Sequence, residues 1–207
     1  MTNPQHSGEA GFELRRIVRI NEEIKSVVAK AFRINLMAMN AIFLAKRAGR
    51  SALGFGVLSN ELRRFATDLQ GQMAALREAT YGSVATVTTL VKQSRISRLL
   101  ELARIEAQGE GATLIRQLVR SRDESTLALS AEQMGALNRR LSHLIADTTQ
   151  VVELGSVLAR SAKIEAAYGG GFSTSLMQVS SDFEKIIGEI QRSLESLTKQ
   201  QAEDVPA

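Results

Sequence analysis

The sequence of 207 residues has no cysteine and no tryptophan, and only 4% of its residues are aromatic. Without cysteine there is no disulfide and no thiolate ligand for zinc. The two histidines, His6 and His143, are too few for us to expect a metal site. Gly169–Gly171 lack the lysine and hydroxyl residue of a P-loop, and no catalytic pattern stands out. We therefore expect a protein without enzyme activity, metal or cofactor.

Proline is even scarcer than the aromatic residues. Its two copies, Pro4 and Pro206, stand near the ends of the chain, so the interior lacks the residue that most strongly interrupts helices. Alanine, leucine, glutamate, arginine and glutamine dominate the composition, which is typical of helical bundles and coiled coils. The predicted fold class is all-α, an elongated antiparallel four-helix bundle or coiled coil made of two helical hairpins.

Neither the charge nor the hydropathy points to nucleic acid or to a membrane-spanning segment. The formal charge is +4, the basic residues are scattered, and no basic patch is rich in aromatics. No apolar run approaches the roughly 20 residues that a membrane span needs. The first ten residues also lack the basic start and apolar core of a signal peptide. We therefore expect a cytoplasmic chain with no nucleic-acid partner and no membrane insertion.

Apolar residues recur at spacings of three and four along most of the chain, which predicts helices with a bundle seam. The most regular seam comprises Ile17, Ile20, Ile24, Val27, Ala31, Ile34, Ala38, Ala41, Ala45 and Ala48. Its change from Ile and Val to Ala predicts that the bundle narrows toward the turn. The predicted segments are 1–10 disordered, 11–108 a first hairpin with its tip at 49–54, 109–111 a reversal, 112–199 a second hairpin with its tip at 169–171, and 200–207 frayed.

Glycines mark the two predicted hairpin turns, where they supply the left-handed conformation that ends a helix. They are Gly49, Gly54, Gly169, Gly170 and Gly171. Reversal at 109–111 would bring both turns to the same end, so that one chain imitates a dimer of hairpins. The second turn looks like a shortened copy of the first, in which Gly171-Phe172 corresponds to Gly54-Phe55 and about three residues are missing. A polar stretch, Arg120–Thr126, predicts a kink or loop.

A second apolar stripe runs beside the first seam and includes Val28, Phe32, Asn35, Met39 and Ile42. A helix with one partner would carry polar residues there. Two interpretations stay open. The stripe is either a contact surface for other molecules or the second buried face of a thick bundle within the chain.

Residues 32–63 align without a gap with the cytoplasmic signalling tip of bacterial chemoreceptors, the methyl-accepting chemotaxis proteins. The matching positions are Phe32, Asn35, Ala38, Asn40, Ala41, Ala45, Arg47, Ala48, Gly49, Gly54, Phe55, Val57, Glu61 and Arg63, with conservative replacements at Leu36, Met37, Met39, Leu58 and Leu62. The chain thus resembles this family strongly over its first third and only faintly over its last third.

The resemblance implies an α-helical hairpin whose tip binds a CheW-type adaptor, a CheA-type histidine kinase or full-length chemoreceptors, with self-association as a further possibility. The implied interaction residues are Phe32, Asn35, Met39, Asn40, Leu44, Arg47, Arg50, Leu53, Phe55, Val57, Glu61 and Arg63. Three of them depart from the family, which has glutamate at Leu44 and Arg50 and arginine at Leu53. Because a charge reversal at an interface rejects the original partner, we expect a modulator of chemotaxis arrays rather than an ordinary kinase activator.

Two alternatives stay open. His143 on a predicted helix could accept a phosphoryl group, as in histidine phosphotransfer proteins, although the residues that flank the phosphotransfer histidine in those proteins are absent here. The chain could instead be a purely structural coiled coil that recruits unrelated partners through Met37, Met39 and Phe43, since methionine suits adaptable surfaces.

Overall fold

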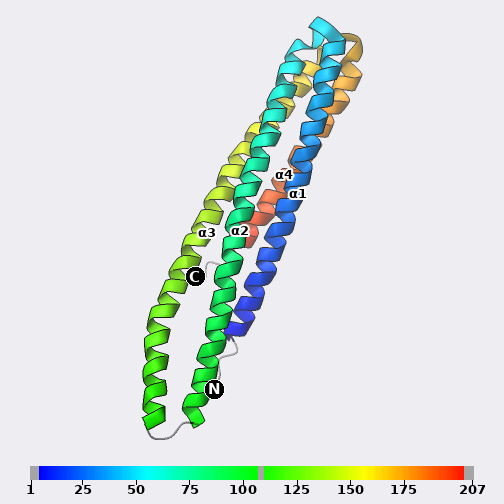
Figure 1. Cartoon of the computed structure of the whole chain (residues 1–207). Helices are drawn as coiled ribbons and strands as arrows, with labels where there is room; N and C mark the ends of the chain where they lie inside the picture. The colour runs from blue at the N-terminus through cyan, green and yellow to red at the C-terminus, as the bar shows by residue number, and fades with distance from the viewer. Residues whose placement is uncertain (1–4, 107–109, 203–207) are drawn as a thin grey trace. The chain divides into compact units, whose positions relative to one another are not determined.

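The computed structural model describes residues 5–106 and 110–202, and this part of the chain is almost entirely helical, with no strand. The predicted all-α class is confirmed. The elements in chain order are α1 (Gln5–Ala48), the 3-10 turn η1 (Gly49–Ala52), α2 (Leu53–Glu106), α3 (Glu110–Ala167), the 3-10 turn η2 (Gly170–Phe172) and α4 (Ser173–Ala202) (Figure 1).

The chain divides into two compact units, and the long helices contribute to both. The first unit contains residues 1–19 and 78–141, and the second contains residues 20–77 and 142–207. We call the second the tip unit, because it contains both turns η1 and η2. It is built from the C-terminal part of α1, the N-terminal part of α2, the C-terminal part of α3, and α4.

The seam predicted for the first helix lies in the core. Every member is buried except Ala48, which is partly exposed: the buried members are Ile17, Ile20, Ile24, Val27, Ala31, Ile34, Ala38, Ala41 and Ala45. Burial of this stripe, rather than the intrinsic helix propensity of its β-branched residues, accounts for most of the stability of α1. On the facing helices, Phe55, Leu62, Leu69, Leu176, Phe183 and Ile190 are fully buried as well.

In the first unit, polar contacts accompany the helix packing. Arg16 is buried, and its Nη2 donates a hydrogen bond of 3.2 Å to Asn138 Oδ1, which links α1 to α3. On the surface of α2, Arg104 donates two hydrogen bonds to the Glu101 carboxylate. These bonds stabilise the charged form and hold the pKa of Glu101 below its ordinary value.

Several predicted boundaries need correction. The helix α1 already begins at Gln5, so the predicted disordered segment 1–10 is wrong for residues 5–10. The helix α3 begins at Glu110, so residues 110 and 111 of the predicted reversal are helical, and it continues through Arg120–Thr126, where no loop interrupts it. At the other end, α4 continues to Ala202. Residues 1–4, 107–109 and 203–207, on which the other parts of these predictions fall, lie outside the described residues.

Contacts inside the tip unit connect each helical segment to the next. A Cβ built on Gly56 of α2 would lie 3.4 Å from Ala45 Cβ of α1. Lys163 of α3 is paired with Glu184 of α4 at 2.5 Å. Lys30 of α1 donates a 3.2 Å hydrogen bond to the buried Ser193 of α4.

The helices α2 and α3 are in contact where the ring of Phe65 packs against Gly155. Gly155 is buried in α3, and a Cβ built on it would lie 2.5 Å from Phe65 Cζ of α2. Real Cβ atoms essentially never come so close to other heavy atoms, so Phe65 occupies the space that any larger residue would need. Glycine in a helix interior costs about 1 kcal/mol relative to alanine, and here the ring contact offsets that cost.

Replacing Gly155 by alanine should therefore destabilise the fold by about 1–3 kcal/mol, as overpacking does in cores. The matched control is Gly71→Ala in α2, where a Cβ meets nothing within 4 Å and the gain in helix propensity should add about 1 kcal/mol. Denaturant unfolding followed by circular dichroism measures both. A smaller side chain in place of the ring, Phe65→Leu, should recover part of the loss in a Gly155→Ala background. Equal stabilisation by both alanine substitutions would contradict the assigned packing.

Candidate interaction site at the hairpin turns

The turn between α1 and α2 depends on one glycine with a left-handed backbone. Gly49 has φ +70° and is the first residue of η1. Ser51 Oγ donates a 3.0 Å hydrogen bond to the carbonyl of Ala48, which satisfies one of the free acceptors at the end of α1. The last turn of α1 carries Lys46 and Arg47, where positive charge is favourable toward the helix dipole.

The turn between α3 and α4 is built in a similar way. Gly170 has φ +57° and begins η2. Just before it, the N–H of Gly169 donates to the carbonyl of Ala166 at 3.1 Å, and Phe172 N–H donates to the carbonyl of Gly169 at 3.1 Å. Among the described residues, Gly49 and Gly170 alone have a left-handed backbone, so the same role expected for Gly54, Gly169 and Gly171 is wrong.

Gly54 and Gly169 are instead places of close approach. A Cβ on Gly54 would collide with the Glu165 carboxylate of α3, and a Cβ on Gly169 would collide with Leu176 of α4. At Gly169 the backbone carbonyl of Ala166 also lies 3.1 Å from such a Cβ, so a larger residue has no room there, whereas at Gly54 the flexible Glu165 side chain would have to move. The two turns also lie side by side, since a Cβ on Gly170 would be 3.7 Å from Ser51 Oγ.

The two hairpins of the tip unit repeat each other with a constant offset and no gap. Gly49 and Gly170 are separated by 121 positions (170 − 49). The same offset pairs core residues on both arms of each hairpin: Ile24 with Ile145, Ala38 with Ala159, Ala41 with Ala162, Ala45 with Ala166, Ser59 with Ser180, Leu62 with Phe183, Leu69 with Ile190 and Leu76 with Leu197, all of them buried.

The hydrogen bonds follow this repeat. Ser59 Oγ donates to the carbonyl of Phe55 at 2.8 Å, and Ser180 Oγ donates to the carbonyl of Leu176 at 3.0 Å. Leu176 therefore takes the place of Phe55. The predicted correspondence of Phe172 with Phe55, with three residues missing, is wrong, because the constant offset pairs Leu176 with Phe55 and leaves no gap.

Most of the predicted interaction residues lie on the surface of the tip unit. Phe32, Met39, Asn40, Arg47, Arg50, Leu53, Val57 and Arg63 are exposed, and Asn35, Leu44 and Glu61 are partly exposed. Phe55 differs, because its side chain is fully buried. As part of the core below the turn, Phe55 supports the tip and has no surface to offer a partner.

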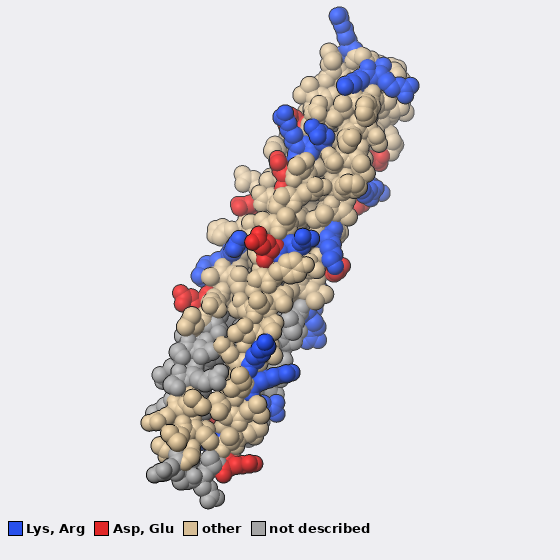
Figure 2. Space-filling view, viewed as in Figure 1, with Lys and Arg blue, Asp and Glu red and all other residues tan. Residues whose placement is uncertain are grey.

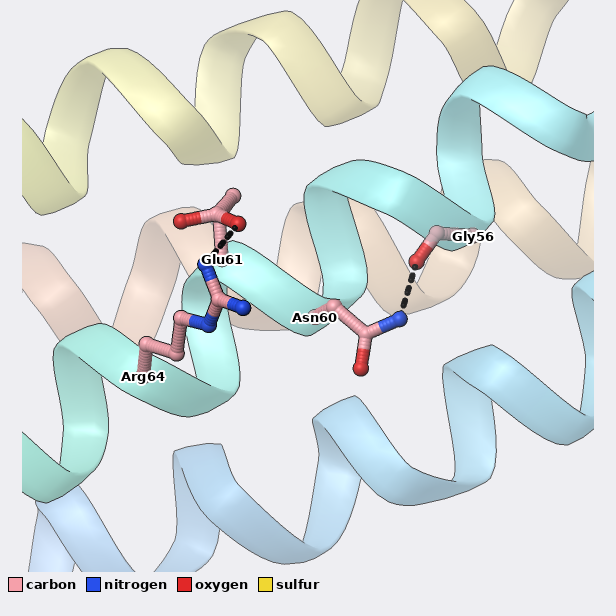
Figure 3. Close-up of polar contacts among 4 residues, drawn as sticks. All are labelled: Gly56, Asn60, Glu61 and Arg64. Atoms are coloured by element: carbon pink, nitrogen blue, oxygen red, sulfur yellow. Dashed lines mark hydrogen bonds and ion pairs between the residues drawn. The ribbon is translucent and has the colours of Figure 1, made fainter.

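Glu61 and its neighbours make contacts within α2. Glu61 accepts a 2.9 Å hydrogen bond from Arg64 Nη1, one turn further along the helix, and Asn60 donates a 3.4 Å bond to the Gly56 carbonyl (Figure 3). The ion pair is largely exposed to solvent, so it contributes little to stability. The hydrogen bond from Arg64 holds the carboxylate of Glu61 in one orientation at the surface, beside the exposed Asn60 in sequence.

The second apolar stripe of α1 faces solvent in this structure, which agrees with the first of the two open interpretations. Val28, Phe32 and Met39 of the stripe are exposed, and Asn35 and Ile42 are partly exposed. Leu36 and Phe43, which lie beside the stripe on α1, are exposed too. Exposed apolar residues that lie together on one helix are typical of association surfaces. Sequence reasoning missed a comparable set on α3, formed by Leu154, Val157, Ile164 and Tyr168. Their spacings of three, seven and four residues were the available signal.

The residues on which the two alternative functions depend lie at or near the surface. His143 is exposed on α3, and Met37 is partly exposed beside Met39 and Phe43. Within residues 5–106 and 110–202, no cluster of three His, Asp or Glu side chains could hold a metal ion.

By length and composition alone, the helical stretch Arg15–Glu106 contains one apolar window that could cross a membrane. Only 28% of that window is buried. Core helices and signal sequences pass the same test, so this signal is weak. The cytoplasmic location stays a prediction.

Comparisons with family models, with curated proteins and with solved structures give no match to this chain. We therefore infer the function from the geometry of the tip unit and from the residue pattern at the first turn.

The left-handed glycine of the first turn can be tested directly. Gly49→Ala should lower the unfolding free energy by about 1–2 kcal/mol, because an L-residue is strained at φ +70°. Gly49→Asn should cost less, since asparagine tolerates this region. In the control Gly171→Ala, the new Cβ meets nothing within 4 Å and the backbone is not left-handed, so thermal unfolding should hardly change. Equal effects at 49 and 171 would refute the turn assignment.

Proposed function

We infer that this protein is a non-enzymatic, chemoreceptor-like signalling protein, and that the tip of its paired hairpins binds components of a chemotaxis array and modulates their signal. The observation that carries the proposal is the α1–α2 turn itself. Several residues that resemble the receptor tip are exposed near one left-handed glycine, and a second turn lies beside it. They are Phe32, Asn40, Arg47, Val57 and Arg63.

The proposed architecture is an antiparallel four-helix bundle within one chain. The contacts that support it form a closed ring around the tip unit: α1 with α2 through Ala45, α2 with α3 through Phe65, α3 with α4 through Lys163, and α4 with α1 through Ser193. Two hairpins related by a constant offset would then imitate the two subunits of a receptor dimer.

The surface chemistry supports a docking role with an altered partner. Asn40, Arg47 and Val57 are retained from the receptor pattern and exposed. Leu44 and Arg50 replace two carboxylates of that pattern, and both reach the surface. A partner suited to the receptor tip would meet an added cation and an added apolar group here, so its affinity should fall or its preference change.

A pull-down from the host cytoplasm tests this function. Wild-type protein should retain a CheW-type adaptor, a CheA-type kinase or chemoreceptors. Asn40→Arg and Met39→Glu, both at exposed positions of α1, should reduce recovery at least about tenfold, as truncating or charging a central contact does. Phe55→Ala is unsuitable, because emptying a buried aromatic site costs about 3–5 kcal/mol of stability.

The matched control is Leu154→Glu, which places the same charge on an exposed leucine of α3. It should leave recovery unchanged. Recovery of only other proteins, or the same recovery of chemotaxis proteins by all variants, would end the proposal.

The single-chain architecture makes a separate prediction about oligomeric state. If the four helical segments close into a bundle within one polypeptide, the chain should fold as a monomer of 22.5 kDa at low micromolar concentration. Its thermal midpoint should then not depend on protein concentration. Light scattering after size exclusion and unfolding at several dilutions measure both. An obligate dimer with no folded monomer would count against the bundle.

A further inference from the structure

The end of the tip unit that carries the turns has a strongly one-sided charge. Between Glu23 and Glu61 the sequence has no acidic residue. The cations in that interval are Lys25, Lys30, Arg33, Lys46, Arg47 and Arg50. Figure 2 shows Lys and Arg side chains gathered where Figure 1 places the α1–α2 turn, with no Asp or Glu among them in that view.

Large apolar side chains are also exposed near the turn that carries the last of these cations. Leu53 is 67% exposed in the first turn of α2, and Phe43 and Val57 lie within ten residues of it in sequence and are also exposed. From the second hairpin, Tyr168 stands beside η2 and is 73% exposed. Cations, exposed aliphatic groups and an aromatic residue are the combination by which proteins bind the interface of an anionic bilayer.

The acid near this end does not cancel the charge. Glu165 of α3 is only partly exposed, and its carboxylate is turned against Gly54 of α2. Lys46, Arg47 and Arg50 are all exposed. Their long side chains can keep the charge at the level of lipid phosphates while their aliphatic stems cover apolar surface.

We propose that the turn end of the tip unit binds anionic phospholipid surfaces peripherally, with Lys46, Arg47 and Arg50 at the headgroup phosphates and Leu53 and Tyr168 in the interface. Charge complementarity selects this occupant: three exposed cations face outward with no exposed acid to offset them. The protein would lie on the membrane without spanning it. This property goes beyond the docking function and does not depend on it.

Purified full-length protein and defined vesicles test the proposal without any protein partner. Sedimentation with phosphatidylcholine vesicles should leave the protein in solution, whereas vesicles with about a third of phosphatidylglycerol should bind it, and binding should weaken as salt rises. Arg50→Glu should lower the partition coefficient about tenfold or more, because each surface cation contributes about fivefold and the variant also adds a negative charge.

Matched controls separate the tip from general charge and hydrophobicity. Arg77→Glu makes the same charge change at an exposed position of α2 away from the turns, and Leu99 is 66% exposed, much like Leu53. Leu53→Ser should weaken binding several-fold, while Arg77→Glu and Leu99→Ser should not. Circular dichroism checks that every variant keeps its helix content.

A fluorescent reporter locates the contact, because the chain has no tryptophan. Leu53→Trp should show a blue-shifted emission with anionic vesicles, and Leu99→Trp should not. Binding to neutral vesicles as strong as to anionic ones, no binding to either, or equal losses in the controls would overturn the proposal. Pelleting without vesicles would also overturn it, since the surface would then join copies of the chain.

Discussion

Close approach between the two hairpins is the constraint on which the tip unit depends. Small residues make it possible: the seam of α1 ends in Ala38, Ala41 and Ala45, and glycines stand where neighbouring side chains press against the backbone. At Gly54 the neighbour is a carboxylate of the other hairpin, and at Gly155 it is a phenyl ring. Because closely packed interiors transmit a displacement from one residue to its neighbours, a shift of one turn should move the other.

The sequence was most informative where a repeating pattern of apolar residues has a single cause, namely burial of one helix face in the core. The seam of α1 is regular because all its positions face the core, and the structure confirms nine of its ten members as buried. The second hairpin was harder, because burial repeats there while residue identity does not: Leu176 stands where Phe55 does, and Phe183 where Leu62 does. The run of three glycines in the second turn was misleading as well, because only Gly170 has a left-handed backbone there, and Gly169 and Gly171 do not.

The site was predicted in part for a similar reason. Phe32 and Met39 lie off the first seam, so the sequence left open whether they are exposed or form a second buried face, and the structure places both on the surface. The burial of Phe55 depends on how the first turn of α2 packs, and the contact of Glu165 with Gly54 joins residues that are far apart in sequence. Neither is encoded in a local pattern. The exposed residues of α3 were overlooked because apolar residues at helical spacing were assigned to the core.

The two hairpins share a core but only part of a surface, and the difference bears on what the chain can bind. Val157 and Ile164 of α3 repeat the exposed Leu36 and Phe43 of α1. The 121-position offset places Glu153 where Phe32 stands and Arg160 where Met39 stands, and all four side chains are exposed. A partner that buries the apolar face of α1 would have to desolvate two charges to bind α3 in the same way, which costs several kcal/mol unless each charge is paired. We therefore expect such a partner to prefer the face of α1, whereas a symmetric dimer of identical hairpins would offer it two equal faces.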